Sequence, residues 1–241
     1  MELCIDIGNS RTKLAFFKRD QLLEYHVAVN SEILKLKQIV QNSSFSTVKL
    51  CTVSQENSEF VQFLKESTNL YIVTSRSKFP IQLDYETPHT LGLDRIMAAV
   101  CAFKLFPEQD CLIINAGTCI TIDFLDAKAY FRGGNITPGL RMRARSMNEF
   151  TAKLPFVEVK DETDQEQLFG RSTNQALIKG IKNGVLYEIE AYYNHLQEKY
   201  PSINVVITGG DGEYLVNRLK FKTFAEPYLV LKGINQLQLD T

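Results

Sequence analysis

Residues suited to phosphate chemistry stand at the start of the chain. A short apolar run ends at Asp6, Gly8 follows two residues later, and polar residues lead into a second apolar run. The pattern predicts a β-hairpin whose turn offers backbone N–H groups and small hydroxyls to an anion, with a carboxylate at its base. Phosphate needs such donors, and the Mg²⁺ that accompanies it needs oxygen ligands. Taken alone, the stretch also fits an ordinary structural turn.

The same pattern occurs a second time. Asn115 stands where Asp6 does and Gly117 where Gly8 does, each 109 residues further along the chain. The second copy also follows an apolar run and precedes a strand-like segment. Two such units, each opening about half of the chain, indicate a duplicated domain. Two phosphate-binding turns opposed across a cleft are suited to holding ATP.

The elements expected around these turns agree with a duplication. Residues 2–74 read as three strands followed by alternating helices and strands, in the order βββαβαβ. This order, present in two halves, is typical of the RNase H-like arrangement of the actin, sugar kinase and Hsp70 ATPase group. We therefore expect an α/β fold of two RNase H-like (actin-like ATPase) domains, residues 1–109 and 110–241, that face each other across a nucleotide cleft.

Two local details of this prediction are specific. Ser31 is expected to cap the first helix, because serine favours that position. A strand is expected over residues 129–132, followed by a glycine-rich stretch from Gly133 to Leu140 whose backbone either turns sharply or approaches a ligand closely.

Composition narrows the class of protein. The 241 residues are 44% hydrophobic, with a formal net charge of −1 and a pI of about 6.3. A basic stretch that would bind nucleic acid and a run long enough to span a membrane are both missing from the sequence. Five cysteines at irregular spacing argue against a disulfide framework and for a reducing compartment. We expect a cytoplasmic protein that binds neither nucleic acid nor membrane.

Two further stretches carry candidate chemistry. Asp94 and Arg95 lead directly into a helix, where Asp94 is either a catalytic carboxylate or a helix-start residue stabilised by the dipole. Gly209 and Gly210 follow a strand and precede a short helix. Their lack of side chains would admit a flat ring such as adenine, although a plain tight turn uses the same residues.

The chain resembles the type III pantothenate kinases, of the acetate and sugar kinase/Hsc70/actin superfamily. The resemblance covers nearly the whole length and rests on six motifs in order. They are residues 6–10 (Asp-Ile-Gly-Asn-Ser), 92–95 (Gly-Leu-Asp-Arg), 116–121 (Ala-Gly-Thr-Cys-Ile-Thr), 133–140 (Gly-Gly-Asn-Ile-Thr-Pro-Gly-Leu), 172–173 (Ser-Thr) and 208–210 (Thr-Gly-Gly).

This resemblance implies ATP-dependent phosphorylation of pantothenate to 4′-phosphopantothenate, the first step of coenzyme A biosynthesis, by a homodimer that uses ATP with Mg²⁺. Asp94 matches the catalytic base, and Asp6 would lie near the Mg²⁺-bound phosphates. The implied ATP-binding positions are Asp6, Ile7, Gly8, Asn9, Ser10, Arg11, Thr12, Lys13, Thr118, Gly209 and Gly210. The implied pantothenate-binding positions are Tyr85, Gly92, Leu93, Asp94, Arg95 and Thr173, the last across a subunit interface.

One position departs from the family. Members commonly have aspartate where this chain has Asn115, and that aspartate helps to hold a monovalent cation, K⁺ or NH₄⁺. Asparagine keeps an oxygen but loses the charge. Cation-independence, support from neighbouring carbonyls and compensation by Asp123 all stay open.

Alternative hypotheses remain beside the kinase. One is a non-catalytic ATP-binding regulator of the same fold, and another is a kinase for a different small hydroxylated metabolite. Arg95 could bind an anionic oxygen or pair with a carboxylate. His89 is an alternative proton acceptor by chemistry alone.

Overall fold

The computed structural model describes residues 1–52, 59–159 and 167–238. The chain forms two compact units. Unit 1 comprises Met1–Leu105, Ala129–Phe131 and Tyr228–Thr241, and unit 2 comprises Phe106–Lys128 and Arg132–Pro227.

Unit 1 contains a five-stranded sheet of order β3-β2-β1-β4-β5. Strands β1 to β3 form an antiparallel meander, whereas β4 and β5 run parallel to β1 because helical crossovers precede them. The predicted order βββαβαβ is confirmed. The elements are β1 (Glu2–Ile7), β2 (Arg11–Lys18), β3 (Gln21–Val29), α1 (Ile33–Gln41), β4 (Thr47–Thr52), α2 (Glu59–Ser67) and β5 (Leu70–Ile72).

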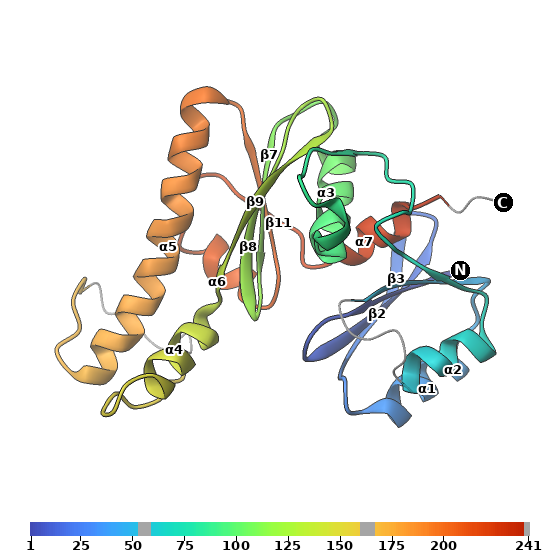
Figure 1. The fold of residues 1–241 in the computed structure, drawn as a ribbon, viewed down its shortest axis with the longest axis horizontal. Coiled ribbons are helices and arrows are strands. Elements are labelled where there is room, and N and C mark those ends of the chain that lie inside the picture. Colours follow the sequence, from blue (N-terminus) through green and yellow to red (C-terminus); the bar gives the residue numbers. More distant parts are fainter. Residues whose placement is uncertain (53–58, 160–166, 239–241) are drawn as a thin grey trace. The chain divides into compact units, whose positions relative to one another are not determined.

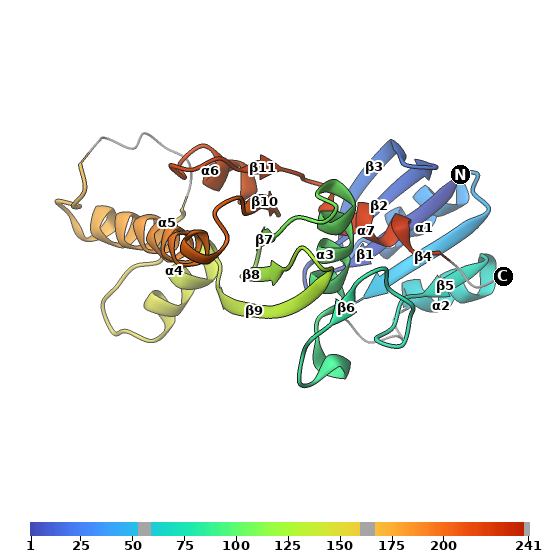
Figure 2. The ribbon, with the colours of Figure 1, turned by 90° about the horizontal axis from the view of Figure 1, so that it is seen from above.

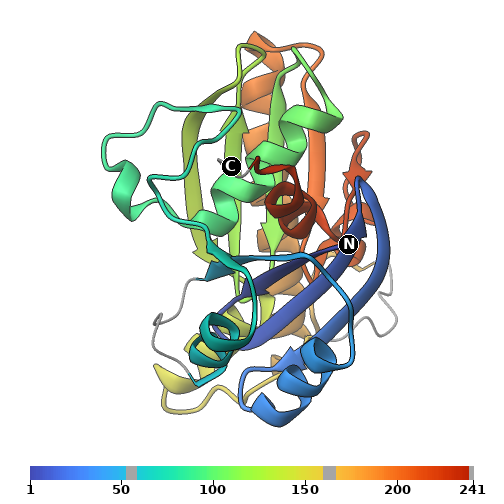
Figure 3. The same ribbon diagram turned by 90° about the vertical axis from the view of Figure 1, so that its right-hand side faces the viewer.

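Helices cover both faces of this sheet (Figures 1 and 3). Buried apolar side chains of α1 and α2 share one core with β1, β2 and β4. On the other face lie α3 (Leu93–Leu105) and α7 (Leu229–Gln236). A Cβ added to Gly233 of α7 would lie 1.9 Å from the carbonyl oxygen of Met97, so only glycine permits this close crossing. The buried Lys49 ammonium donates to the carbonyl oxygens of Asn235 and Leu237 and so holds the end of α7.

Unit 2 repeats the strand order of unit 1. Its sheet runs β11-β10-β7-β8-β9, which is the order of unit 1 with β7 in the place of β1. Helices α4 and α5 cover one face, and α6 lies beside β10 and β11 (Figures 1 and 2). The elements are β7 (Cys111–Ala116), β8 (Cys119–Leu125), β9 (Tyr130–Pro138), α4 (Leu140–Glu149), α5 (Thr173–Lys199), β10 (Asn204–Thr208), α6 (Gly212–Val216) and β11 (Phe224–Ala225).

The first residues of β9 belong to unit 1. Tyr130 and Phe131 pair in parallel with β6 (Gln82–Leu83). A short 3₁₀ helix, η1 (Pro88–Thr90), follows β6 and leads into α3. In the described part of the chain, no helix combines the length and apolarity that a membrane crossing requires.

Two local predictions were wrong. The strand predicted to end at residue 132 continues to Pro138, because Gly134 serves close packing rather than a turn. A Cβ at Gly134 would lie 2.1 Å from Asp123 Oδ1 on the neighbouring strand. Ser31 does not occupy the N-cap of α1. Glu32 stands there and instead accepts a hydrogen bond from the backbone N–H of Val29.

Candidate functional site

The first turn (residues 6–13) joins β1 to β2 in unit 1. Its backbone is closed by a hydrogen bond from the Gly8 N–H to the Arg11 carbonyl oxygen, at 3.0 Å. The side chains of Asn9, Ser10 and Arg11 are exposed at the tip. A closed hairpin therefore presents polar groups and a cation outward, as the sequence predicts for an anion-binding turn.

Asn30, which follows β3, braces this turn and was missed in the sequence. Its side-chain amide donates to the Gly8 carbonyl oxygen at 2.8 Å, and its Oδ1 accepts from the Thr12 hydroxyl at 2.9 Å. Its backbone N–H donates to the Ser10 carbonyl oxygen. Three bonds from one residue fix the turn. The only local signal was an asparagine directly after a strand, which is common at plain strand ends.

Asp6 lies at the base of the first turn and is only 5% exposed. Burial raises the pKa of its carboxyl, the Lys13 ammonium opposes that rise, and the Asp94 carboxylate adds to it. The Lys13 Nζ lies 3.4 Å from Asp6 Oδ2. The two carboxylates are therefore near enough to repel each other, although 88 positions separate Asp6 and Asp94 in the chain.

Asp94 stands in the first turn of α3. The carbonyl oxygen of Gly92, just before the helix, accepts from the N–H groups of Arg95 and Ile96. The Asp94 carboxylate folds back over Gly92, so that a Cβ there would lie 2.6 Å from its Oδ1. Gly92 thus leaves room for one orientation of the Asp94 side chain.

Buried Arg95 lies among aromatic rings. Its guanidinium carbon is 5.9 Å from the ring centroid of Tyr85 and 5.6 Å from that of Phe131. The two rings themselves meet edge to face, with centroids 6.2 Å apart. The Arg95 guanidinium therefore holds the rings of the half-buried Tyr85 and the buried Phe131 in place by cation–π contacts. The nearby His89 is exposed on η1, and Leu93 is half-buried.

The second turn (residues 115–121) joins β7 to β8 in unit 2. The Gly117 N–H donates to the Cys119 carbonyl oxygen, and Thr118 is exposed at the tip. Gly139, the N-cap residue of α4, packs directly beneath this tip. Its N–H donates to the Thr118 carbonyl oxygen at 3.1 Å, and a Cβ on it would lie 2.2 Å from the Gly117 carbonyl oxygen.

A glycine pair after β10 meets the second turn. Gly209 has φ +97°, and a Cβ on it would lie 2.2 Å from the Ala116 carbonyl oxygen. Both facts require glycine. Gly210 is exposed and has no atom within 4 Å of the position a Cβ would take, so this flank is open. Burial raises the pKa of the Asp211 carboxyl that follows.

Asn115 lies half-buried at the end of β7. It is paired across the sheet with Thr121, whose buried hydroxyl has no hydrogen-bond partner in the described part of the chain. Asp123, two residues further along β8, is fully buried and packs against Gly134. It stands two residues, about 7 Å along the strand, from Thr121, the cross-strand partner of Asn115.

Thr173 is the first residue of α5 and is exposed. The Ser172 hydroxyl before it accepts from the Gln175 N–H at 3.3 Å and caps the helix.

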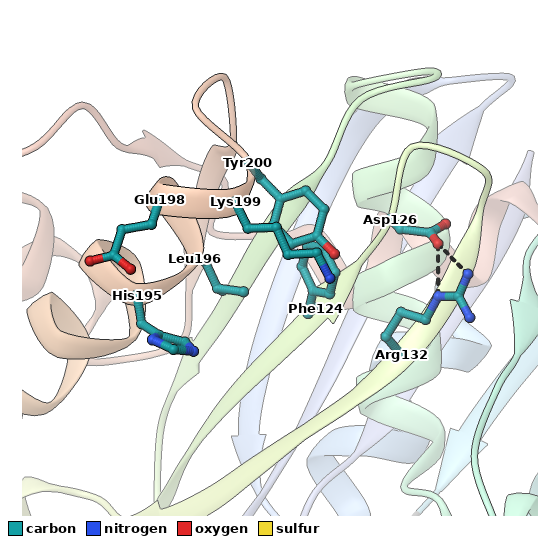
Figure 4. Close-up of a pocket in the computed structure, with 8 residues that line it drawn as sticks. All are labelled: Phe124, Asp126, Arg132, His195, Leu196, Glu198, Lys199 and Tyr200. Carbon is teal, nitrogen blue, oxygen red and sulfur yellow. Dashed lines mark hydrogen bonds and ion pairs between the residues drawn. The ribbon is translucent and has the colours of Figure 1, made fainter.

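A separate cavity of about 790 Å³ opens at the far end of α5 (Figure 4). Phe124 and Tyr200, with ring centroids 4.8 Å apart, meet there with the Arg132–Asp126 ion pair. None of the residues predicted for ATP or pantothenate lines it. We therefore give it no part in phosphate chemistry.

The residues of the first turn fit Mg²⁺ that is brought by a nucleotide. Among the described residues, no three histidine, cysteine or acidic side chains cluster as a metal cage. Mg²⁺ in phosphate-transferring sites commonly takes one or two carboxylates, water and the phosphates themselves. Asp6, at the base of the first turn, supplies one such carboxylate.

Known proteins resemble this chain along its length. A family model for type III pantothenate kinase matches residues 2–195. The type III pantothenate kinase of Phocaeicola vulgatus is 39% identical over 238 residues, which is 98% of this chain and 97% of that protein.

Two solved structures share the fold. A Campylobacter jejuni protein described as a Baf family transcriptional activator superposes with a TM-score of 0.65 at 22% identity, covering 98% of this chain and 96% of that one. A Sinorhizobium meliloti protein described as a 2-dehydro-3-deoxygalactonokinase gives a TM-score of 0.55 at 12% identity, covering 97% of each chain. The predicted α/β fold of two RNase H-like domains is confirmed.

Proposed function

Because the chain belongs to the type III pantothenate kinase family, we propose that it transfers the γ-phosphoryl group of ATP to pantothenate. The product is 4′-phosphopantothenate, the first intermediate of coenzyme A biosynthesis. One observation supports this reaction best, namely that the buried Asp6 of the first turn lies near enough to Asp94, at the start of α3, for the Asp94 charge to raise the pKa of Asp6. The two carboxylates give one group for the metal–phosphate side and one for the hydroxyl.

The role of each residue follows from phosphoryl-transfer chemistry. The substrate hydroxyl oxygen forms a bond to the γ-phosphorus, the bond from that phosphorus to the β–γ bridging oxygen breaks, and ADP leaves. Asp94 orients the hydroxyl and accepts its proton. The first turn, with Lys13, and Thr118 of the second turn bind the phosphates. Positioning and charge neutralisation supply most of the catalysis.

Mg²⁺, when bound with ATP, neutralises charge that develops on the phosphates. Asp6 is the residue of this chain that we expect to hold it, through the phosphates and water. Lys13 shares the same carboxylate and supplies a fixed positive charge beside it.

Pantothenate is bound by residues at the start of α3 and by Tyr85, which precedes this helix in the chain. Tyr85, held by Arg95, presents a ring with a hydroxyl, and Gly92 to Arg95 present the helix start. Gly209 and Gly210 flank the adenosine. Thr173 contributes from a second copy of the chain.

We expect catalysis without a monovalent cation. Asn115 and the Thr121 hydroxyl offer only neutral oxygens at the end of β7, and Asp123 lies deeper in the sheet. K⁺ or NH₄⁺ would find no charged ligand there. Added K⁺ should therefore change the rate little.

We also infer a homodimer. Large exposed apolar side chains lie on the end of β9, on α4 and α5, and on the segments after α4 and before α5, and a second copy would cover them. They include Ile136, Met142, Phe150, Phe156, Leu168, Phe169 and Tyr187. Light scattering on the purified chain should give twice its mass of 27.4 kDa, and a mass of 27.4 kDa would exclude the dimer.

The activity is tested by pantothenate-dependent release of ADP from ATP and Mg²⁺. Asp94→Asn keeps the shape but not the base, so kcat should fall by about 10²- to 10⁴-fold while thermal unfolding is unchanged. A wild-type protein that releases no ADP with pantothenate, with or without K⁺ or NH₄⁺, would overturn the proposal. Release with another hydroxylated metabolite would favour the alternative kinase, and ATP binding without any turnover would favour the regulator.

A further inference from the structure

We propose that Arg143 is a positioning residue for the second turn and that, through it, Arg143 sets the affinity for ATP. The proposal rests on the proposed function, in which Thr118 contacts the nucleotide. Arg143 lies in α4 and touches no residue predicted to bind substrate. It acts through the segment Thr137–Gly139 that packs beneath the tip of the second turn.

The guanidinium of Arg143 donates hydrogen bonds to the segment Thr137–Gly139 from two of its nitrogens. Nε donates to the Pro138 carbonyl oxygen at 2.8 Å, and Nη2 donates to the Thr137 hydroxyl at 2.7 Å. The backbone N–H of Arg143 donates to the Gly139 carbonyl oxygen at 2.9 Å. Three consecutive residues at the end of β9 are thus held by one side chain and its own amide.

Glu188 of α5 fixes the guanidinium itself. Its Oε2 pairs with Arg143 Nη2 and also accepts a hydrogen bond from the Thr137 hydroxyl. A Cβ added to Gly184, one turn earlier on α5, would touch Nη1 at 3.7 Å, so the guanidinium lies directly against this helix. The two charged side chains are only 23% and 28% exposed, which weakens screening by solvent and salt.

Gly139, the last residue of this segment, contacts the second turn directly. The Gly139 N–H donates to the Thr118 carbonyl oxygen, and the Gly139 Cα lies so close that a Cβ would reach within 2.7 Å of that oxygen. No side chain caps the N-terminus of α4 at Gly139. Arg143 and Glu188 instead hold the segment Thr137–Gly139, and Gly139 contacts the tip of the second turn.

This arrangement requires arginine. Only the planar guanidinium can donate from Nε to a carbonyl while Nη2 meets a hydroxyl and a carboxylate. Lysine at position 143 would keep the charge but lose the fork. Glutamine at position 188 would keep an acceptor but lose the charge.

The test compares the affinity for ATP, measured by calorimetry, in Arg143→Lys, Arg143→Gln and Glu188→Gln. We expect ATP to bind about 5- to 50-fold more weakly in both Arg143 variants, because a shift of the turn by a fraction of an ångström misplaces phosphate donors. The KM for pantothenate should stay within about twofold, since the predicted pantothenate residues lie elsewhere. Arg145→Gln is the matched control, because it removes an exposed ion pair with Glu149 from the same helix.

Amide hydrogen exchange supplies a second measurement that turnover does not affect. Exchange should rise at residues 117–119 and 137–140 in the Arg143 and Glu188 variants, and not in Arg145→Gln. The double variant Arg143→Gln/Glu188→Gln should bind ATP no more weakly than Arg143→Gln, because the pair acts as one unit.

The two proposals fail in different ways. ATP affinity in folded Arg143→Gln within twofold of the wild type, or unchanged exchange at the second turn, would overturn the role of Arg143. Failure of the wild type to release ADP with pantothenate would overturn the proposed function and leave the affinity ratio intact. Should Arg143→Gln not fold, Arg143→Lys and Glu188→Gln decide the question.

Discussion

Replacing Gly92 with alanine tests the placement of Asp94, the proposed catalytic base, without changing the Asp94 side chain itself. A Cβ at this position would lie 2.6 Å from Asp94 Oδ1, about 1 Å short of ordinary contact, while its next neighbours on Arg95 lie at 3.7 and 3.8 Å. No backbone atom obstructs the added methyl group. The Asp94 carboxylate is therefore the group that must move.

The size of the effect follows from that displacement. A misplacement of about 1 Å in a reacting group costs on the order of 100-fold in rate, so kcat of Gly92→Ala should fall by about that factor. Stability should change little, because Gly92 precedes α3 and glycine to alanine at a helix start costs about 1 kcal/mol or less. Loss of activity without loss of fold is the expected signature.

The assay is ADP release with saturating pantothenate, read together with the thermal midpoint. Gly180→Ala is the control, because a Cβ there meets no atom within 4 Å and alanine favours the interior of α5. It should keep full activity and gain a little stability. The double variant Gly92→Ala/Asp94→Asn should be no slower than Asp94→Asn alone, since both changes remove the same group. Full kcat in Gly92→Ala, or additive losses in the double variant, would refute the orientation assigned to Asp94.

Further predictions concern stability, pH and cations. Gly209→Ala should lower the free energy of unfolding, measured in urea, by about 2 kcal/mol or more, because φ is positive and the added Cβ meets a backbone oxygen. Gly210→Ala should lower it by less than about 1 kcal/mol, because its Cβ meets no atom within 4 Å. Equal losses in the two variants would contradict these contacts. Burial raises the pKa of Asp6, so the stabilisation from its protonated form is complete below the unfolded pKa and is lost as the pH rises through the folded pKa. In the absence of nucleotide, the uncharged Asp6→Asn variant should therefore become more stable relative to the wild type as the pH rises through the folded pKa of Asp6. If the difference in unfolding free energy between the two proteins stays constant with pH, Asp6 does not carry a buried charge. Asn115→Asp should create stimulation of ADP release by K⁺ that the wild type lacks, and a strong K⁺ dependence of the wild type would show that neutral oxygens suffice.

Both hairpins could be predicted because their signals are local. Each apolar run ends at a turn residue, and the constant offset between Asp6 and Asn115 relates the two copies. The strand order that units 1 and 2 share agrees with this repeat of the sequence pattern. Asp94 was likewise marked by its place before a helix.

The groups that hold these residues could not be predicted, because they come from distant segments. Asn30 reaches Gly8 across the sheet, and Arg143 meets Glu188 on another helix. Glycines were ambiguous for the same reason. Gly134 indicated a turn in the sequence, yet it sits inside a strand because a buried carboxylate packs against it. A glycine that permits close packing and one that permits a turn look alike until the neighbour is known.

The place of α7 has a consequence for how the chain is made. Unit 1 begins at the first residue, but α7, which packs on α3 and is held by Lys49, is translated only after all of unit 2. The sheet that carries Asp6 thus emerges from the ribosome with one face covered by α3 alone, without α7, while residues 132–227 are synthesised. Domains made first usually fold first. Here unit 1 is complete only after unit 2 has been made, and a chain that ends before residue 228 lacks the helix that packs on α3.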